Sequence, residues 1–352
     1  MANAIFKNVQ IGGIAAAVPS HIEKATDYIG RMTEDEVDQF VRGTGVKERH
    51  VAHEKQTTSD LCYVAAERLI KSKGYDKDSF DALIFITQTP DYLQPATAHI
   101  LHLRLGMPMD CMAFDINLGC SGYIYGLHIA ASLLQSENFK RILLLSGEVE
   151  RPNPLIPIKD HILFGNAGTA TIIEKGETEI CTLLRSDGRD YSALIIPGGN
   201  LRNPITDEAK YFEAIFPRMD GETVFAFSIT KVPRAFKDFY EIYGCGPENF
   251  DFCVLHQANE LIMKTVSKKA GFTWDKVPVS LDRYGNTSSA SVPLTIADMC
   301  ERQPKNRKLK LIMSGFGIGM SWGVASVIID TSDVLPVITT DDYFKEAYHV
   351  DC

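Results

Sequence analysis

The stretch MAFDINLGCSGYIYGLHIAASLLQSENFKRILLLSGEVE, residues 112–150, decides the fold. It opens with MAFDIN, a β-rich apolar run that predicts a buried strand. Residues 122–139 (GYIYGLHIAASLLQSENF) have the length and apolar content of a helix, and residues 141–150 (RILLLSGEVE) predict a second strand. A strand, a helix and a strand in this order indicate a parallel α/β unit with a right-handed crossover.

The same alternation recurs on both sides of this unit. Before it, DALIFITQTP (81–90) predicts a strand and a turn. In the second half, NFDFCVLHQAN (249–259) predicts a strand and a loop, and ELIMKTVSKKAGF (260–272) predicts a helix that ends at Gly271. KLKLIMSGFGIG (308–319) predicts another strand, followed by a glycine turn. Both halves of the chain therefore use one architecture.

Two similar glycine turns indicate that the halves arose by duplication. FGNAGTATII (164–173) and FGIGMSWGVASVII (316–329) each join a Phe-Gly pair to a β run of small residues, and each ends its half. A chain of 352 residues also exceeds the size at which a single hydrophobic core usually stops growing. We therefore predict an N-terminal half over residues 1–173 and a C-terminal half over residues 174–352.

The composition excludes several classes of protein. With 45% hydrophobic and 23% charged residues, the chain is ordinary for a globular protein and has no apolar run long enough to span a membrane. Its formal net charge of −9 disfavours nucleic acid as a partner. The eight cysteines and nine histidines lack the spacing of a disulfide framework or metal site, so we expect reduced thiols and no metal. The glycine turns do not fit a dinucleotide fingerprint, and the opening residues lack a secretory signal, which predicts a cytoplasmic protein.

Cys120 stands at the tight loop between the predicted strand and the predicted helix. Most buried cysteines only pack as small hydrophobic side chains, and Cys111, Cys253 and Cys300 are predicted to do so because they lie in or beside apolar patterns. At the start of a helix, unpaired N–H groups and the helix dipole favour a thiolate. This position predicts a lowered thiol pKa for Cys120 and a nucleophilic sulfur.

Two polar residues of the second half are candidate partners for that sulfur. His256 directly follows the strand FDFCV, where the active sites of α/β proteins lie, although a single histidine there is more often structural. Asn286 lies in RYGNTSSASVP, before the helix that includes PLTIADM, and such a segment is also an ordinary turn and helix cap. Taken singly, neither residue establishes a catalytic site.

Several motifs together resemble one family. The resemblance rests on DINLGCSGYIYGL (115–127), HQAN (256–259), YGNTSSASVP (284–293) and GFGIGMSWG (315–323). Their order and spacing are similar to those of β-ketoacyl-acyl carrier protein synthase III, in the thiolase-like superfamily. The likeness covers nearly the whole chain, with further matches at TGVKERHV (44–51), MDGETVFAF (219–227) and VASVIID (324–330). It implies a five-layered α-β-α-β-α fold made of two duplicated halves, and a homodimer.

The resemblance also implies a mechanism. Cys120, His256 and Asn286 form the catalytic triad, and the Cys120 thiolate takes an acyl group from a thioester. The N–H groups of Cys120 and Gly317 form the oxyanion hole. A malonyl thioester then loses CO₂, and His256 and Asn286 donate hydrogen bonds to the oxygen of the resulting enolate. Attack of this carbanion on the acyl-cysteine gives a β-ketoacyl thioester, without a metal or organic cofactor.

The sequence departs from the family pattern where the acyl donor binds. Gln39 and Gly43 stand where many members have an aromatic residue and an arginine around the adenine of coenzyme A. Ala226 and Leu261 replace basic residues that dock coenzyme A or carrier protein. These differences argue against acetyl-coenzyme A as the primer, because stacking and phosphate pairing are lost. We therefore expect a donor on an acyl carrier protein, or an unusual coenzyme A ester.

Further residues are predicted to dock the carrier protein and to line the acyl pocket. A basic docking site for an acidic carrier protein is predicted at Lys231, Arg234, Lys264, Lys268 and Lys269. A solvated helix face explains these same charges equally well. The acyl pocket is predicted to include Phe164 and Gln94, and Gln94 stands where the family often has an apolar residue that closes the partner's acyl tunnel. This exchange predicts a more polar or wider pocket.

Three other functions compete with condensation. A cysteine protease uses the same residue types, but papain-like enzymes carry their cysteine near the mature N-terminus in a different motif. An acyltransferase of the same fold moves an acyl group to an oxygen or nitrogen acceptor, and Asn286 argues against this because simple transfer needs only a nucleophile and a base. A non-catalytic partner subunit of a ketosynthase commonly lacks the nucleophile, which this chain keeps.

Overall fold

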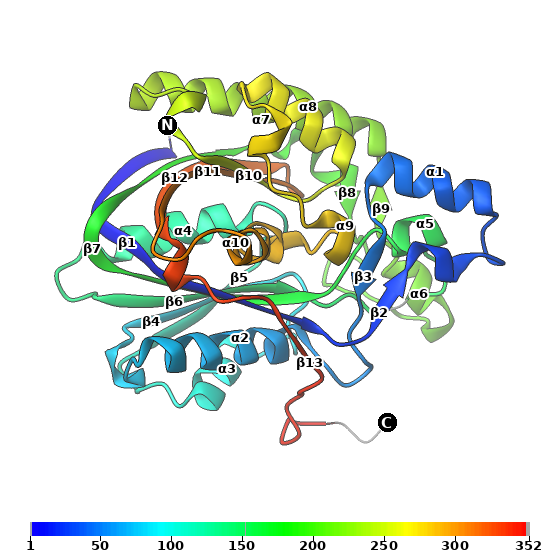
Figure 1. Ribbon diagram of the computed structural model, residues 1–352. Helices are drawn as coiled ribbons and strands as arrows, with labels where there is room; N and C mark the ends of the chain where they lie inside the picture. The colour runs from blue at the N-terminus through cyan, green and yellow to red at the C-terminus, as the bar shows by residue number, and fades with distance from the viewer. Residues whose placement is uncertain (1, 152, 350–352) are drawn as a thin grey trace.

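The strand–helix–strand unit of residues 112–150 is present in the structure. A computed structural model describes residues 2–151 and 153–349, and it contains β5 (Met112–Ile116), α4 (Gly122–Leu133) and β6 (Arg141–Glu148) (Figure 1). Helix α4 ends earlier than residue 139, in a turn through the polar residues of QSEN. β4 (Ala82–Ile86) lies between β5 and β6 and pairs with both in parallel.

β5 corrects one expectation, because it is not a buried strand. It ends the strand order of the sheet and pairs only with β4 among the described strands. Met112 is 39% exposed, and the other residues of β5 are half-buried. The apolar pattern of MAFDIN correctly predicts a strand. It does not reveal that this strand lies at the edge of the sheet, where one side has no neighbouring strand among the described residues of a single chain.

The second half repeats the pairing of the first. In the first half, β4 and β6 are parallel, and β6 is antiparallel to β7 (Ala167–Ser186). In the second half, β10 (Phe252–Leu255) and β11 (Lys308–Gly317) are parallel, and β11 is antiparallel to β12 (Ser321–Asp330). The two Phe-Gly turns predicted from the sequence lead into β7 and β12.

Two long strands run through both halves. β7 pairs with β6 up to Glu174 and with β12 from Cys181 onward. β1 (Ala2–Pro19) is antiparallel to β7 along almost its whole length, with irregularities in register near Asn8 and Gly12. The proposed division between residues 173 and 174 thus falls inside β7, next to the point where its partner changes from β6 to β12.

The helices and the two sheet regions form five layers (Figure 1). α2 (Thr58–Lys73) and α3 (Thr97–Leu105) cover the outer face of β4 and β6. α4 and α10 (Ser291–Glu301) lie between the sheet regions, in one apolar cluster with strands of both halves. α7 (Gly221–Tyr243) and α8 (Glu260–Ala270) cover the outer face of β10, β11 and β12. The thiolase-like α-β-α-β-α fold is confirmed.

Shorter elements surround these layers. They are β2 (Ile22–Lys24), α1 (Glu34–Thr44), β3 (Glu48–His50), α5 (Ile158–His161), β8 (Leu194–Ile195), α6 (Tyr211–Ala214), β9 (Arg218–Met219) and α9 (Leu281–Tyr284). Near the C-terminus, β13 (Ile338–Thr340) adds to the sheet in parallel with β1. Across residues 2–151 and 153–349, none of the helices is both long and apolar enough to cross a membrane.

Candidate active site

Cys120 lies in the loop between β5 and α4, one residue before the helix cap Ser121. A Cβ atom built on Gly317 would lie 2.8 Å from the Cβ of Cys120 and 3.1 Å from its Sγ. Only glycine therefore lets the turn after β11 approach the sulfur this closely. The Oγ atoms of Ser121 and Ser321 are 2.6 Å apart and join the two loops. An oxyanion hole at the N–H groups of Cys120 and Gly317 stays a prediction.

The turn that precedes α10 meets Cys120 from the other half of the chain. The Oγ of Ser288 lies 3.7 Å from the Sγ of Cys120. The N–H of Ser288 donates to the Oδ1 of Asn286 at 2.9 Å, and its carbonyl accepts from the Oγ of Ser291 at 2.8 Å. Ser288 has a φ of +48°, in the left-handed region. The side chains of this turn are therefore held in place by one another.

His256 approaches the same turn from the end of β10. Its N–H donates to the carbonyl of Ser314 at 2.8 Å, and its Nδ1 lies 2.8 Å from the Oγ of Ser291. The ring is 2% exposed and meets the ring of Phe316 edge to face, with 5.5 Å between the centroids. Burial lowers the pKa of His256 to about 3, because the imidazolium loses its hydration. The imidazole is therefore neutral at neutral pH.

The pKa expected for Cys120 is wrong in direction. The sequence predicted a lowered value from the helix terminus, but burial raises the pKa of Cys120 to about 11. A hydrogen bond from Ser288 opposes this shift, and the carboxyls of Glu148 and Glu150 add to it. The loss of hydration outweighs the hydrogen bonds to the sulfur from Ser288 and from the N–H of Cys120 itself. Cys120 is accordingly a neutral thiol at neutral pH and not a preformed thiolate. Cys111, Cys253 and Cys300 are buried, as predicted.

Two glutamates near the sulfur were missed by the sequence interpretation. Glu148 is buried and accepts hydrogen bonds from the N–H of Gln88 at 3.1 Å and the Oγ1 of Thr89 at 2.8 Å. Burial raises its pKa to about 8. The pKa of Glu150 is raised in the same direction, although its side chain is exposed to solvent. The run GEVE directly after an apolar strand is the signal that could have identified both.

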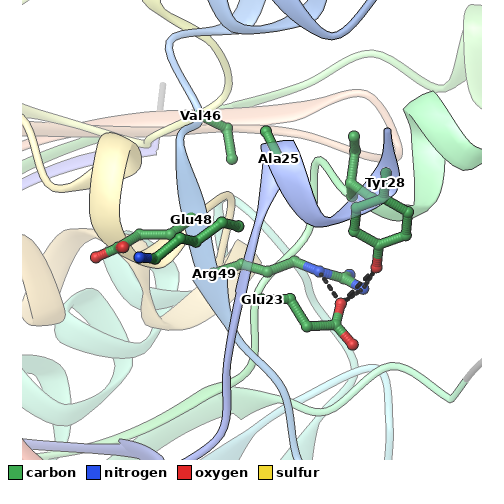
Figure 2. Close-up of a pocket in the computed structure, with 8 residues that line it drawn as sticks. Glu23, Ala25, Tyr28, Val46, Glu48 and Arg49 are labelled. Atoms are coloured by element: carbon green, nitrogen blue, oxygen red, sulfur yellow. Dashed lines mark hydrogen bonds and ion pairs between the residues drawn. The ribbon is translucent and has the colours of Figure 1, made fainter. Parts of the chain in front are cut away.

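Arg49 bonds to Glu23 and Tyr28 (Figure 2), and it also reaches the segment next to Asn286. Its buried guanidinium donates to the Oε2 of Glu23 at 2.6 Å and to the carbonyls of His161 and Phe164 at 2.6 and 2.9 Å. Phe164 forms an isolated β-bridge with Asn286. Phe164, which was predicted to line the acyl pocket, thus lies beside Asn286. Gln94, by contrast, lies in the loop before α3 and is exposed in the single chain.

The predicted docking residues share the outer helical layer. Lys231 and Arg234 are exposed on α7, and Lys264, Lys268 and Lys269 are exposed on α8. We call these five residues the basic face. Lys264 is engaged by Glu260 at 2.8 Å and lies over the ring of Trp274, and Lys269 donates to the carbonyl of Ile229 at 2.8 Å. The last contact joins α8 to α7.

A groove of about 520 Å³ lies between α1 and the two-stranded sheet of β2 and β3. It is lined by Lys24, Ala25, Thr26, Val37, Asp38, Val41, Arg42, Lys47 and Glu48. Gln39 and Gly43, the two departures from the family pattern, lie on this same helix. The N–H of Lys47 donates to the carbonyl of Asp282 at 3.1 Å. This bond connects the groove to the segment that leads to Asn286.

Comparison with known proteins gives one family. Residues 114–190 match the model of 3-oxoacyl-[acyl-carrier-protein] synthase III, and residues 241–329 match the model of its C-terminal part. The chain is 34% identical to the β-ketoacyl-[acyl-carrier-protein] synthase III of Caldanaerobacter subterraneus subsp. tengcongensis, over 90% of this chain and 96% of the relative.

Solved structures agree with this match. The 3-oxoacyl-(acyl-carrier protein) synthase of Burkholderia xenovorans LB400 superposes with a TM-score of 0.88 at 34% identity, over 96% of this chain and 99% of that one. OleA of Xanthomonas campestris superposes with a TM-score of 0.78 at 21% identity, over 92% and 98% of the chains, and shares the fold. The chain therefore belongs to the 3-oxoacyl-[acyl-carrier-protein] synthase III family and is a condensing acyltransferase of that kind.

Proposed function

We propose that Cys120 receives an acyl group from a thioester and that His256 and Asn286 serve its condensation with a malonyl thioester. One observation carries this proposal. Cys120 and Asn286 both contact Ser288, at 3.7 and 2.9 Å, and His256 contacts Ser291 three residues further on. Three residue types that the chemistry needs thus meet at one turn, although they come from distant parts of the chain.

In the first half-reaction, the Sγ of Cys120 attacks the thioester carbonyl. A new S–C bond forms, the C–S bond to the carrier breaks, and the proton of the thiol ends on the carrier thiol. The N–H groups of Cys120 and Gly317 are the proposed donors to the tetrahedral oxyanion. Because the thiol is neutral at neutral pH, it has to lose its proton in the course of this half-reaction.

In the second half-reaction, the malonyl thioester loses CO₂ and becomes an enolate that attacks the acyl-cysteine. Asn286 is oriented to stabilise this enolate. Its Oδ1 already accepts the N–H of Ser288 at 2.9 Å, so the two N–H groups of its Nδ2 remain as donors for the thioester oxygen. The product is a β-ketoacyl thioester, and Cys120 is released as a thiolate that takes up a proton.

Intact-mass measurement of wild type and Cys120→Ala tests these steps. Each protein is incubated with acyl thioesters and then with malonyl-acyl carrier protein. Acylation of wild type alone, followed by a β-ketoacyl product, is the expected result. Persistent acylation without decarboxylation would instead favour transfer to an oxygen or nitrogen acceptor. The absence of acylation with every donor would favour a non-catalytic partner subunit.

An acyl carrier protein is the proposed donor of the acyl group. The basic face on α7 and α8 offers exposed cations to an acidic carrier, and the groove at α1 contributes Lys24, Arg42 and Lys47. Acylation rates with acyl-carrier protein and with acetyl-coenzyme A discriminate between the donors. We expect the carrier-bound acyl group, or an unusual coenzyme A ester, to react faster. A clear preference for acetyl-coenzyme A would contradict this proposal.

A cytoplasmic homodimer is the proposed assembly. β5 leaves one edge of its sheet open in the single chain, and the side chains of Leu103, Met109 and Met112 on or near it are exposed by 73%, 98% and 39%. A second copy that pairs with this edge would remove both the open hydrogen-bonding groups and the apolar surface from water. Light scattering should give twice the mass of the chain, and Met112→Lys should shift it toward the monomer.

A further inference from the structure

The C-terminal tail, residues 341–349, is packed onto the first half of the chain. It contains neither helix nor strand, but it contacts α2, α3 and the loop between β4 and α3. We propose that the tail positions this loop, residues 87–96, beside Cys120 and thereby influences which acyl groups reach the sulfur. The influence on acyl groups rests on the proposed function, whereas the positioning of the loop does not.

The first contact of the tail covers a buried ion pair. Arg104 on α3 lies 2.9 Å from the carboxylate of Asp60 on α2, and the two side chains are 8% and 2% exposed. The N–H of Phe344 donates to the same carboxylate oxygen at 2.8 Å, and the ring of Phe344 lies 4.7 Å from the guanidinium of Arg104. Buried charges need such partners, so the tail helps to keep this ion pair in place.

The ion pair is linked to the loop through Ser59. The Nη1 of Arg104 donates to the Oγ of Ser59 at 3.2 Å, and this hydroxyl donates to the Oδ2 of Asp91 at 2.7 Å. Ser59 is 0% exposed, so water does not replace these bonds. A connected set of hydrogen bonds therefore runs from the tail to the carboxyl of Asp91 in the loop.

A second contact joins the tail to the loop directly. The hydroxyl of Tyr92 donates to the carbonyl of Tyr348 at 2.7 Å. At the other end of the tail, the side-chain amide of Gln56 donates to the carbonyls of Thr340 and Asp342 at 3.1 and 3.0 Å. Gln56 is 0% exposed, and a buried amide needs hydrogen-bond partners. The course of the tail is thus fixed on both sides of its contact with the ion pair.

The loop that the tail contacts meets the segment before Cys120 at both of its ends. Near its start, Gln88 lies so close to Gly119 that a Cβ atom built on this glycine would be 2.3 Å from the Oε1 of Gln88. Just past its end, the N–H of Thr97 donates to the carboxylate of Asp115 at 2.7 Å. Gln88 is exposed. A displaced loop would therefore change the surface beside the sulfur.

Hydrogen exchange read by mass spectrometry tests whether the tail holds the loop. Phe344→Ala removes the ring from Arg104 and should speed exchange in peptides of residues 88–97 by roughly 2- to 30-fold, as expected when a cation–π contact is lost. Phe344→Tyr keeps the ring and should exchange like wild type. Tyr343→Ala is the matched control, because that neighbouring ring contacts His53 and Lys55. Exchange in α4 reports any general loss of stability.

Two results would overturn the positioning of the loop. One is wild-type exchange at residues 88–97 in Phe344→Ala, and the other is equal acceleration in Phe344→Ala and Tyr343→Ala. Tyr92→Phe removes only the hydroxyl that donates to Tyr348, so it tests the second contact without disturbing the ion pair. It should speed exchange in the same peptides, by less than Phe344→Ala. If Phe344→Ala does not fold, wild-type exchange in Tyr92→Phe overturns the proposal.

Acylation of Cys120 tests the influence on acyl groups. Rates are measured in wild type, Phe344→Ala and Tyr343→Ala with a short and a long saturated acyl thioester on the same carrier. The ratio of the two rates should change by roughly 10-fold in Phe344→Ala, as when the fit of one methylene in a pocket changes, and should stay at the wild-type value in Tyr343→Ala. A loss of stability alone lowers both rates together, so an unchanged ratio in Phe344→Ala would overturn this influence. If wild type accepts neither thioester, the proposed function fails, and hydrogen exchange still decides the positioning of the loop.

Discussion

The Phe-Gly turns of the two halves have the same sequence pattern and different neighbours. A Cβ atom on Gly165, in the first half, would lie 1.9 Å from the carbonyl oxygen of Tyr284, in the second half. A Cβ atom on Gly317, in the second half, would lie 2.8 Å from the Cβ of Cys120, in the first. Each turn thus packs against a loop of the opposite half that carries a residue of the proposed catalytic site.

The two contacts serve different purposes. Gly165 donates its N–H to the carbonyl of Asn286 at 3.1 Å, so the first turn holds the backbone that carries the amide. Gly317 lies against the side chain of Cys120, the proposed nucleophile. Two turns of similar sequence therefore differ in place: one supports the backbone of Asn286, and the other lies beside the sulfur of Cys120. Substitution of the two glycines should separate these roles.

The largest effect is expected on catalysis at Gly317. Gly317→Ala would place a methyl group within contact distance of the sulfur and push the oxyanion donors out of position. The rate of acylation of Cys120 should fall on the order of 10²-fold, as when an oxyanion donor is lost. The melting temperature should fall less than in Gly165→Ala, because the new methyl group meets the Cβ of Cys120 at 2.8 Å, whereas a methyl group on Gly165 meets a backbone carbonyl oxygen much more closely. Wild-type acylation kinetics in this variant would contradict the position given to Gly317.

A smaller effect, on stability, is expected at Gly165. Gly165→Ala forces a methyl group against backbone, which cannot move aside as a side chain can. Overpacking of this kind costs roughly 1–3 kcal/mol or more of unfolding free energy. Denaturant unfolding measures this cost, and Gly43→Ala is a control because no atom lies within 4 Å of that position. If Gly165→Ala were stable and Gly317→Ala unfolded, the distinction between the two turns would be wrong.

The two halves can also be compared at the loops that follow their parallel strands β4 and β10. The loop after β10 carries the neutral His256, whereas the loop after β4 binds the carboxyl of Glu148. The pKa of Glu148 is raised from 4.5 to about 8, so the folded protein binds more protons than the unfolded chain between these values. The contribution of Glu148 to the unfolding free energy should therefore fall as pH rises through this window and level off above it, whereas the lowered pKa of His256 acts in the opposite direction below 6.5.

Glu148→Gln should remove the contribution of Glu148 to the pH dependence of the unfolding free energy, because an amide does not titrate. Thermal unfolding between pH 5 and about pH 8 measures it. Glu213→Gln, on the exposed surface of α6, should retain the wild-type slope. An equal slope in wild type and Glu148→Gln would show that the carboxyl is not protonated in the folded state.

The smallest effect is a change in the thiol pKa of Cys120 when Glu150 is substituted. Its carboxyl raises the pKa of the Cys120 thiol less than burial does. Glu150→Gln removes this charge and should lower the thiol pKa below the wild-type value of about 11. The rate of alkylation by iodoacetamide as a function of pH reports the change. A thiol pKa that does not move would place Glu150 too far from the sulfur to act on it.

Much of the fold could be predicted, because the information is local. Apolar periodicity indicates β4, β6, β10, β11 and α8, and the left-handed φ of +93° at Gly271 ends α8 where glycine was expected to. The loops of Cys120, His256 and Asn286 could be located in the same way. The contact between Cys120 and Ser288 could not, since 168 residues separate them.

The other wrong or missing predictions concern burial, which depends on the whole fold. An apolar run predicts a strand, but the neighbours that cover it are set by the whole topology, so β5 was wrongly expected to be buried. The pKa of Cys120 was wrongly expected to be low, because a helix terminus is visible in the sequence whereas loss of hydration is not. Glu148 was overlooked since its partners, Gln88 and Thr89, lie on a neighbouring strand's loop.

The continuity of β7 limits how substrate can reach the sulfur. A single strand of 20 residues is hydrogen-bonded to β6 near one end and to β12 near the other, and β1 follows it along both. Rotation of one half away from the other would break these ladders together. No hinge between the halves is therefore available for opening, and donor entry and product release fall to the loops that border the site. Turnover should then respond to changes in those loops and be insensitive to agents that restrain the relative motion of the halves.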